Sequence, residues 1–298
     1  MHGCLQSPAA VLSQLPADLP ADLPDQVSRA LREDIGSGDV TAVLIPAQQR
    51  ARARVLCREA AIICGAPWFD DTFRQLDPAV RIEWRIVEGA RTPANSILCE
   101  LTGPARPILT GERTALNFLQ LLSGTASVTQ RYVEALRGTR CRILDTRKTI
   151  PGLRSAQKYA VRCGGGTNHR LGLYDMVLIK ENHIAAAGSI GAAVSAARAQ
   201  SSGVRVEVEV ENLEQLRQVL DAHADLVMLD NFDFDGMRAA VALNRAHSRP
   251  ALLECSGGVT LERVPAIAAT GVDYISVGSL TKNVDAVDLS MRFAAVDH

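Results

Sequence analysis

The second half of the chain alternates short apolar runs with helix-compatible segments, and this alternation constrains the fold more than any other feature. The apolar runs end near Asp145, Lys180, Val210, Asp230, Cys255 and Val277. Between them lie segments such as LEQLRQVLDAHA and LERVPAIAATG, which are typical of helices. Strands and helices that alternate on this pitch predict a parallel sheet and an α/β fold.

Polar residues end every one of these runs, which favours a barrel over an open sheet. A site at a switch point of an open doubly wound sheet draws on only a few strands, whereas a (β/α) barrel presents all its strand ends on one face. A further short strand is expected near Thr167 to His169. We therefore expect an incomplete barrel of about seven parallel strands over residues 125–283, with the open sheet as the alternative.

Residues 1–124 predict a separate domain, a mostly antiparallel sheet with helices attached. A leader over residues 1–24 is too rich in proline for a regular helix, and a helix over 25–34 should end at Gly36. Paired strands are expected over 51–65, then strands over 80–89 and 96–103. One helix is expected over 104–124, closed by Gly124, and a second over 127–138. The segment 284–298 is predicted to be a helix that packs back on the first domain.

The composition excludes several classes of protein. The net charge is −1 and the sequence pI is near 6.6, which argues against nucleic acid as a partner. The seven cysteines are scattered without ligand spacing, so we expect reduced core residues rather than disulfides or zinc ligands. Because no apolar run approaches the ~18 residues of a membrane span and no basic leader precedes one, we expect neither membrane insertion nor export, and a cytoplasmic location.

Positive charge is concentrated between Asp145 and His183. This stretch has seven Lys or Arg against three acids, although the whole chain is near neutrality. Arg147 and Lys148 follow one predicted strand, and Lys180 follows another. His169 and Arg170 come directly after the glycines of GGGTNHR, more glycines than a helix C-cap needs. Solvated loop residues would explain each feature alone, but their positions at strand ends indicate a ligand site.

Carboxylates and a second glycine-rich region complete the predicted site. In VRVEVEVEN the acids Glu207, Glu209 and Glu211 alternate with valines, a pattern of an exposed edge strand or of a polar barrel interior. Asp230 ends the next run, where an N-cap is the alternative role. The loops ECSGGVT and ISVGSLTK follow the last two strands, where backbone N–H groups commonly cradle a phosphate. Two such loops in succession favour phosphate binding. The cations close by call for a ligand with several negative charges.

These motifs carry a resemblance. DTRKTIPGLRSAQKYAVRCGGGTNHRLGLYDMVLIKENHI, with GERTALN before it and EVEVEN, MLDNF, SGGVT and ISVGSLTK after it, closely resembles the quinolinate phosphoribosyltransferase family, also called nicotinate-nucleotide pyrophosphorylase (carboxylating). The resemblance covers about residues 39–293. It implies an N-terminal α/β sandwich, an incomplete barrel, and a homodimer or larger assembly with shared active sites. The implied reaction joins quinolinate to phosphoribosyl pyrophosphate with Mg²⁺, giving nicotinate mononucleotide, CO₂ and pyrophosphate in NAD biosynthesis.

The resemblance also implies a role for each site residue. The quinolinate carboxylates would be held by Arg113, Arg147, His169, Arg170 and Lys180, with Arg113 from the partner chain. The phosphates would meet Arg58, Lys148 and Lys282, and the 5′-phosphate would lie on Ser256, Gly257, Gly258, Gly278 and Ser279. Glu209 and Asp230 would take the ribose hydroxyls and Mg²⁺, directly or indirectly, and Thr146 would contact substrate. Lys148, Lys180, Glu209 and Asp230 are the expected catalytic residues.

Three alternatives remain open from the residues alone. Lys180 at a barrel strand end could be the Schiff-base nucleophile of a lyase, although an anion pocket would favour its charged and unreactive form. A non-catalytic binder of phosphorylated metabolites is a second alternative, against which the presence of Glu209 and Asp230 argues. Nicotinate is the nearest competing substrate, but it has a single carboxylate for four cations: Arg113, Arg147, Arg170 and Lys180.

Overall fold

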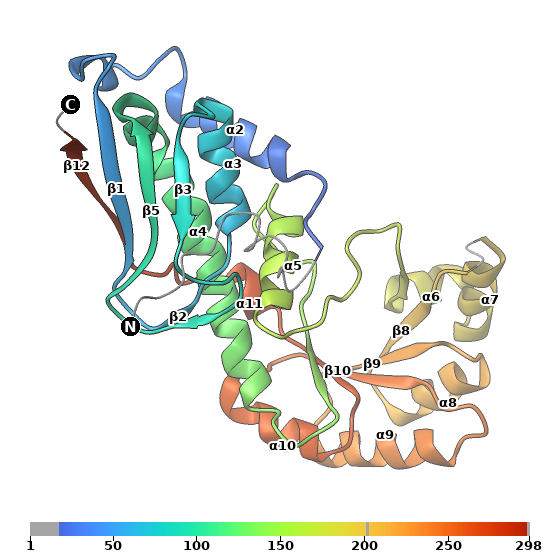
Figure 1. Ribbon diagram of the computed structural model, residues 1–298. Helices are drawn as coiled ribbons and strands as arrows, with labels where there is room; N and C mark the ends of the chain where they lie inside the picture. The colour runs from blue at the N-terminus through green and yellow to red at the C-terminus, as the bar shows by residue number, and fades with distance from the viewer. Residues whose placement is uncertain (1–17, 201–202, 297–298) are drawn as a thin grey trace. The chain divides into compact units, whose positions relative to one another are not determined.

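The computed structural model describes residues 18–200 and 203–296, which fold into two compact units (Figure 1). The first unit contains the described parts of Met1–Gln130, Ile150–Gly165 and Leu280–His298, and the second contains Arg131–Thr149 and Gly166–Ser279. Each unit is therefore assembled from separate stretches of chain. The contiguous domains expected from the sequence, 1–124 and 125–283, stay a prediction.

The first unit is built on an antiparallel sheet in the order β12-β1-β5-β3. Its strands are β1 (Arg50–Cys57), β3 (Arg81–Trp84), β5 (Ser96–Pro104) and β12 (Leu289–Val296). Side chains of β1 alternate between exposed and buried, as expected for a sheet with one face on a core. The core on that face also contains Phe69 and Phe73 of α3 (Ala66–Leu76) and Leu116 and Leu119 of α4 (Ala105–Glu134). The unit is an α/β sandwich.

Among the smaller elements of the first unit, one helix falls where the sequence predicts it. Helix α2 (Leu23–Ile35) ends at Gly36, whose φ of 54° lies in the left-handed region. The described part of this unit also contains the 3₁₀ turn η1 (Ala42–Leu44), α5 (Arg154–Cys163) and, except for its first residue, α11 (Ser279–Lys282). The prediction of paired strands over 51–65 is wrong in its pairing: β1 pairs with β5 and β12, whereas β2 (Ala61–Ile62) pairs with β4 (Arg91–Thr92). Residues 1–17 of the predicted leader lie outside the described residues.

Gly124 does not end a helix as predicted. Helix α4 continues through it to Glu134 and so joins the two helices expected over 104–124 and 127–138. The reason for a glycine is contact with another segment: a Cβ at position 124 would lie 2.2 Å from the carbonyl oxygen of Asp285. The glycine therefore permits a close backbone approach within the first unit rather than a turn.

The predicted C-terminal helix over 284–298 is also wrong. The segment forms β12, which pairs antiparallel with β1 from Cys57↔Leu289 to Arg50↔Val296. The edge of β1 offers this segment backbone hydrogen bonds along eight residues, and Leu289 joins the core while Met291 packs against it. Pairing with an open strand edge thus outweighs local helix propensity. The segment does belong to the first unit, as expected.

The second unit contains a parallel sheet in the order β6-β11-β10-β9-β8-β7. Its strands are β6 (Arg142–Leu144), β7 (Val177–Ile179), β8 (Val206–Val210), β9 (Leu226–Asp230), β10 (Leu252–Ser256) and β11 (Tyr274–Ser276). Its helices are α6 (Glu181–Ala187), α7 (Ile190–Gln200), α8 (Leu213–Asp221), α9 (Phe234–Ala246), the 3₁₀ turn η2 (Leu261–Arg263) and α10 (Val264–Ala269). The alternation of strand and helix follows the sequence prediction.

The strand order identifies an incomplete barrel rather than an open doubly wound sheet. The first strand of the unit, β6, pairs with the last, β11, and the remaining strands follow in reverse chain order. A parallel bridge between Leu144 and Thr167 adds the short seventh strand position that the sequence predicts. Among the described residues no ladder joins β7 to that position. The barrel is therefore open on this side.

The predictions about the cysteines and about membrane-spanning segments can be compared with the described residues. Six of the seven cysteines fall within them, and all six are buried and outside any disulfide. Burial raises the pKa of the Cys141 thiol to about 12, as expected for an inert core residue. None of the described helices combines the length and apolar character needed to span a bilayer.

Candidate active site

A cavity of about 310 Å³ opens at the C-terminal ends of the parallel strands in the second unit. This volume lies at the lower end of the range for small-molecule sites. The lining includes nine residues that the sequence predicts for the site: Thr146, Arg147, Lys148, His169, Arg170, Lys180, Glu209, Asp230 and Ser256. Parallel strands bring their carboxyl ends to one edge, so residues far apart in sequence converge there.

Two guanidinium groups share this cavity. Burial and the nearby charge of Arg147 both lower the pKa of Arg170. Arg147 Nε is a buried donor for which the described residues provide no acceptor. Two adjacent cations, one with an unsatisfied donor, are unfavourable unless an anion lies between them. The region around Arg147 and Arg170 is therefore suited to a ligand with more than one negative charge.

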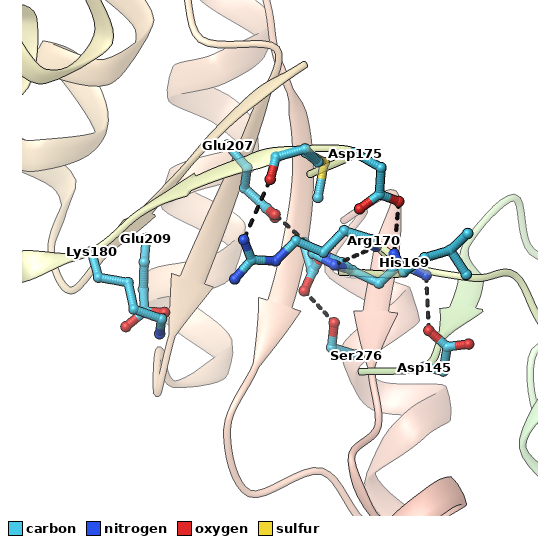
Figure 2. A network of polar contacts seen from close by, with 11 residues as sticks. Asp145, His169, Arg170, Asp175, Lys180, Glu207, Glu209 and Ser276 are labelled. Atoms are coloured by element: carbon cyan, nitrogen blue, oxygen red, sulfur yellow. Dashed lines mark hydrogen bonds and ion pairs between the residues drawn. The ribbon is translucent and has the colours of Figure 1, made fainter. Parts of the chain in front are cut away.

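The carboxylates of the cavity lie beside a lysine. Lys180 follows β7, and its Nζ donates to Glu209 Oε2 on the neighbouring strand β8 (Figure 2). Asp230 ends β9 and accepts a 2.9 Å hydrogen bond from the side chain of Asn231. Asn231 has a φ of 56°, in the left-handed region, and its backbone N–H donates to Ser256 O. These bonds hold Asp230 at the cavity wall.

The two glycine loops are tightly fitted to their neighbours. Gly257 has a φ of 93°, and a Cβ there would lie 2.1 Å from Asn231 Oδ1. A Cβ at Gly278 would lie 3.0 Å from Lys148 Cδ. Lys148 itself follows a local turn in which its N–H donates to Thr146 Oγ1 at 3.0 Å. The glycines thus let these loops approach Lys148, which lines the cavity, and Asn231, which contacts the lining residue Asp230.

A largely buried cluster around His169 lies inside the barrel and shares His169, Glu254 and Ser276 with the lining of the cavity. His169 Nε2 is 2.8 Å from Glu207 Oε2 and 3.4 Å from Glu254 Oε2, and both glutamates are fully buried. Ser276 Oγ donates to Glu254 Oε1. Burial opposes a charge on His169, whereas the contacts with Glu207 and Glu254 raise its pKa. Because Nδ1 accepts the Arg170 N–H, the ring carries its proton on Nε2, toward Glu207. Burial, followed by the charge of Glu254, raises the pKa of Glu207.

Sequence reasoning assigned no role to Glu254, Ser276 or Asp145, and placed Glu207 only on the interior face of its strand. Glu254 and Ser276 line the cavity, and Asp145 accepts hydrogen bonds from the Asn168 side chain and the His169 N–H. The available signal was a polar residue inside an otherwise apolar strand. A polar residue in a strand indicates a site only once the strand order is known, because the order brings β8, β10 and β11 together around His169.

The remaining predicted site residues fall into two groups. Gly257 and Gly258 follow Ser256, and Gly278 follows β11, so these three lie on strand-end loops of the second unit, and Ser279 begins α11. Arg58, Arg113 and Lys282 lie in the first unit, and all three are exposed. Arg58 contacts Ser290 Oγ at 3.3 Å and Asp288 Oδ1 at 4.0 Å. A role for these three residues in the site stays a prediction.

The donor set at Glu209 and Asp230 fits a magnesium ion that arrives with a phosphorylated substrate. Mg²⁺ is commonly held by one or two carboxylates together with substrate phosphates. Within the described residues, neither carboxylate belongs to a group of three ligands close enough to enclose an ion. Such groups occur at His169, Glu207 and Glu254 and at Cys64, Glu88 and Cys163. The carboxylates could therefore share an ion with a ligand but do not form a complete cage.

The fold and the site define an α/β-barrel protein that binds a small polyanionic ligand at its strand ends. Comparisons with known proteins agree. The model of the quinolinate phosphoribosyl transferase N-terminal domain matches residues 39–123, and that of the C-terminal domain matches residues 125–292. The chain belongs to the quinolinate phosphoribosyl transferase family.

Individual relatives match over nearly the whole chain. A probable nicotinate-nucleotide pyrophosphorylase (carboxylating) of Bacillus subtilis is 45% identical over 261 residues, covering 87% of this chain and 89% of that protein. The nicotinate-nucleotide pyrophosphorylase (carboxylating) of Mycobacterium leprae is 43% identical over 274 residues, covering 90% of this chain and 95% of that protein. The structure of the nicotinate-nucleotide pyrophosphorylase from Francisella tularensis matches with a TM-score of 0.89 and 46% identity, covering 94% of this chain and 99% of that one.

Proposed function

We propose that this protein transfers the phosphoribosyl group of phosphoribosyl pyrophosphate to the ring nitrogen of quinolinate. The products are nicotinate mononucleotide, CO₂ and pyrophosphate, a step of NAD biosynthesis. Membership of the family supports the activity. The observation in the site that supports it most is the pair Arg147 and Arg170, two cations in one cavity with a buried Nε that lacks an acceptor. A dicarboxylate meets this need better than a monocarboxylate does.

We assign the second substrate to the other side of the cavity. Glu209 and Asp230 would accept from the ribose hydroxyls, and Lys148 would meet the phosphates. The loops at Ser256–Gly258 and Gly278–Ser279 would cradle the 5′-phosphate with backbone N–H groups. Mg²⁺, held jointly by Glu209, Asp230 and the pyrophosphate, would stabilise the charge that develops on the departing group. Arg58 and Lys282 would add phosphate contacts.

The reaction asks the protein for positioning and charge rather than for a general base. The pyridine nitrogen attacks with its own lone pair, and the transition state at C1′ resembles an oxocarbenium ion. Lys148 stabilises the leaving pyrophosphate, and the carboxylates of Glu209 and Asp230 stabilise the cationic ribose. Once the nitrogen carries ribose, the electron-poor ring releases the adjacent carboxylate as CO₂ and retains the electron pair of the broken C–C bond. A proton then binds to that ring carbon in place of the carboxylate. Partial exclusion of water from the cavity favours that loss.

The contact between Lys180 and Glu209 argues against a Schiff-base lyase. A nucleophilic lysine attacks with the lone pair of Nζ, whereas Nζ of Lys180 donates a hydrogen bond to the carboxylate of Glu209. A lyase would form an adduct that borohydride traps in the presence of a carbonyl substrate. We expect no adduct at Lys180.

The test of the function is release of labelled CO₂ from carboxyl-labelled quinolinate, with phosphoribosyl pyrophosphate and Mg²⁺. Release should require all three components, and nicotinate should replace quinolinate poorly. Removal of divalent ions by a chelator should stop the release, and added Mg²⁺ should restore it. Binding of both substrates without CO₂ release in their joint presence would favour a non-catalytic binder instead.

We further propose that the active protein is a homodimer or a larger assembly with shared sites. In this arrangement Arg113 of one chain completes the dicarboxylate site of another. The exposed position of Arg113 on α4 is compatible with such a role. A cytoplasmic location stays a prediction.

A further inference from the structure

Both ring nitrogens of His169 are held by protein groups. Nε2 lies 2.8 Å from Glu207 Oε2 and 3.4 Å from Glu254 Oε2. Nδ1 accepts the backbone N–H of Arg170 at 2.8 Å. The side chain of His169 is only 7% exposed. In this arrangement the imidazole has no free N–H to direct at a ligand, so any effect of His169 on a ligand passes through the groups that it contacts.

Through Nδ1, His169 contacts the backbone of residues 169–172, the segment that carries Arg170. Four successive N–H groups of this segment donate to side chains rather than to a helix or a ladder. The His169 N–H donates to Asp145 Oδ1 at 2.9 Å and the Arg170 N–H to His169 Nδ1. The N–H groups of Leu171 and Gly172 donate to the two carboxylate oxygens of Asp175 at 2.7 and 3.0 Å. Side-chain acceptors therefore fix the backbone from which Arg170 extends into the cavity (Figure 2).

Burial of the Glu207 and Glu254 carboxylates lowers the stability of the fold. Glu207 and Glu254 are fully buried. Glu207 Oε1 lacks a hydrogen-bond partner within the described residues, and Glu254 Oε2 has only the 3.4 Å charge contact with His169 Nε2 in place of a hydrogen bond. Apolar side chains of similar volume often stabilise a protein as well as a buried ionic cluster does, or better. Their retention in the barrel interior therefore points to a function that apolar residues would not supply.

We propose that Glu207 and Glu254 are positioning residues that act through His169 to hold Arg170 at the dicarboxylate end of the cavity. The glutamates fix the imidazole through Nε2, the imidazole fixes the Arg170 peptide through Nδ1, and the guanidinium then faces the ligand beside Arg147. This inference rests on the proposed function and adds two residues to it. It predicts an effect on quinolinate and none on the phosphoribosyl substrate, whose assigned contacts lie elsewhere in the cavity.

The test replaces Glu207 by leucine, which removes the acceptor for Nε2 but fills the space. Quinolinate binding and phosphoribosyl pyrophosphate binding with Mg²⁺ are measured separately by calorimetry, and thermal unfolding is recorded. Misplacement of a ligand-binding group by about 1 Å can cost up to about 100-fold, so we expect quinolinate to bind between about 10-fold and 100-fold more weakly. Binding of phosphoribosyl pyrophosphate should change less than about twofold, and the thermal midpoint should stay level or rise. Glu211→Leu, four residues further along the chain and exposed, is the matched control.

The kinetic counterpart is a rise in the KM for quinolinate with the KM for phosphoribosyl pyrophosphate unchanged. Unchanged quinolinate affinity in a folded Glu207→Leu variant, or equal weakening of both substrates, would overturn the proposal. Should that variant not fold, Glu254→Leu tests the same relation, because the shorter contact between Glu207 and His169 remains. A smaller loss of quinolinate affinity is then expected, and no loss overturns the proposal. CO₂ release by the wild-type protein tests the proposed function independently of these variants.

Discussion

Arg147 is the residue on which dicarboxylate binding most depends. Its buried Nε has no acceptor within the described residues, so a ligand oxygen is the partner that this donor requires. Arg170 lies close enough for its pKa to be lowered by burial and then by the charge of Arg147. Two guanidinium groups in this relation are preorganised for an anion because their mutual repulsion is relieved only when the anion binds.

We expect Arg147→Ala and Lys180→Ala to weaken quinolinate binding by about 2 to 5 kcal/mol, as is typical when one partner of a buried charge pair is truncated. Arg142→Ala, at the exposed start of β6, removes the same positive charge away from the cavity and serves as the control. Calorimetric titration with quinolinate measures the difference. If both variants keep the affinity of the wild type, neither residue belongs to the dicarboxylate site.

Residues at strand ends could be predicted from the sequence, whereas residues inside the strands could not. Arg147, Lys180 and Asp230 follow apolar runs, so a one-dimensional pattern already places them at one edge of the sheet. Glu254 lies in the middle of β10, and its contact with Ser276, the last residue of β11, depends on these two strands being neighbours. The bonds of His169 also required the structure, because nothing in GGGTNHR indicates that its ring turns toward two glutamates.

At the scale of elements, Gly124 shows how tertiary contact overrides local preference. In isolation a glycine after LQLLS predicts the end of a helix, yet α4 continues because the glycine admits the Asp285 carbonyl. The segment of β12 likewise forms a strand rather than the predicted helix because it pairs with β1, which is remote in sequence. Helix and strand existence followed from periodicity in most of the chain. Boundaries and pairings depended on contacts that periodicity does not contain.

Gly124→Ala should destabilise the protein although alanine is the better helix former. The added methyl would meet a backbone oxygen at 2.2 Å, and overpacking of this kind costs about 1 to 3 kcal/mol. Gly191→Ala on α7 is the matched control because a Cβ there meets nothing within 4 Å. That variant should gain about 0.5 to 1 kcal/mol from helix propensity. Urea unfolding measures the free energy of unfolding of both variants, which should fall for Gly124→Ala and rise for Gly191→Ala. A higher free energy of unfolding for Gly124→Ala would contradict the packing argument.

The contact between α3 and β3 should make stability depend on pH. Burial raises the pKa of Asp70 to about 7, although the hydrogen bond from Trp84 Nε1, 2.8 Å long, acts in the other direction. Below the ordinary carboxyl pKa near 4, both the folded and the unfolded state hold the proton. Between about pH 4 and 7 the unfolded state loses it first, so the stability falls as the pH rises.

Asp70→Asn keeps an oxygen for Trp84 Nε1 and removes the titration. Relative to the wild type, this variant should gain in thermal midpoint as the pH rises from about 4 to 7, with no further gain above that range. Glu83→Gln, an exposed neutralisation on β3, should leave the pH profile as it is. Parallel profiles for the wild type and Asp70→Asn would show that this carboxyl does not titrate in the expected range.

At the scale of the whole molecule, shared sites predict complementation between two inactive variants. If Arg113 acts in a neighbouring chain, Arg113→Ala and Lys180→Ala should each be nearly inactive alone. Mixed dimers would contain one intact site each, so an equal mixture that exchanges subunits should recover roughly a quarter of the wild-type activity. CO₂ release measures the recovery, and sedimentation measures the size of the assembly. Absence of recovery in a mixture shown to exchange subunits would place both residues in one chain's site.

The pairing of β12 with β1 also has a consequence for biosynthesis. β1 emerges from the ribosome early, but the strand that covers its edge is translated only after the entire barrel. Throughout elongation the nascent protein therefore carries an open strand edge. The arginines at positions 50, 52 and 54 hinder its association with other polypeptides, since charged side chains on an edge discourage intermolecular pairing. The amino-terminal sheet can therefore close only after β12 itself has emerged.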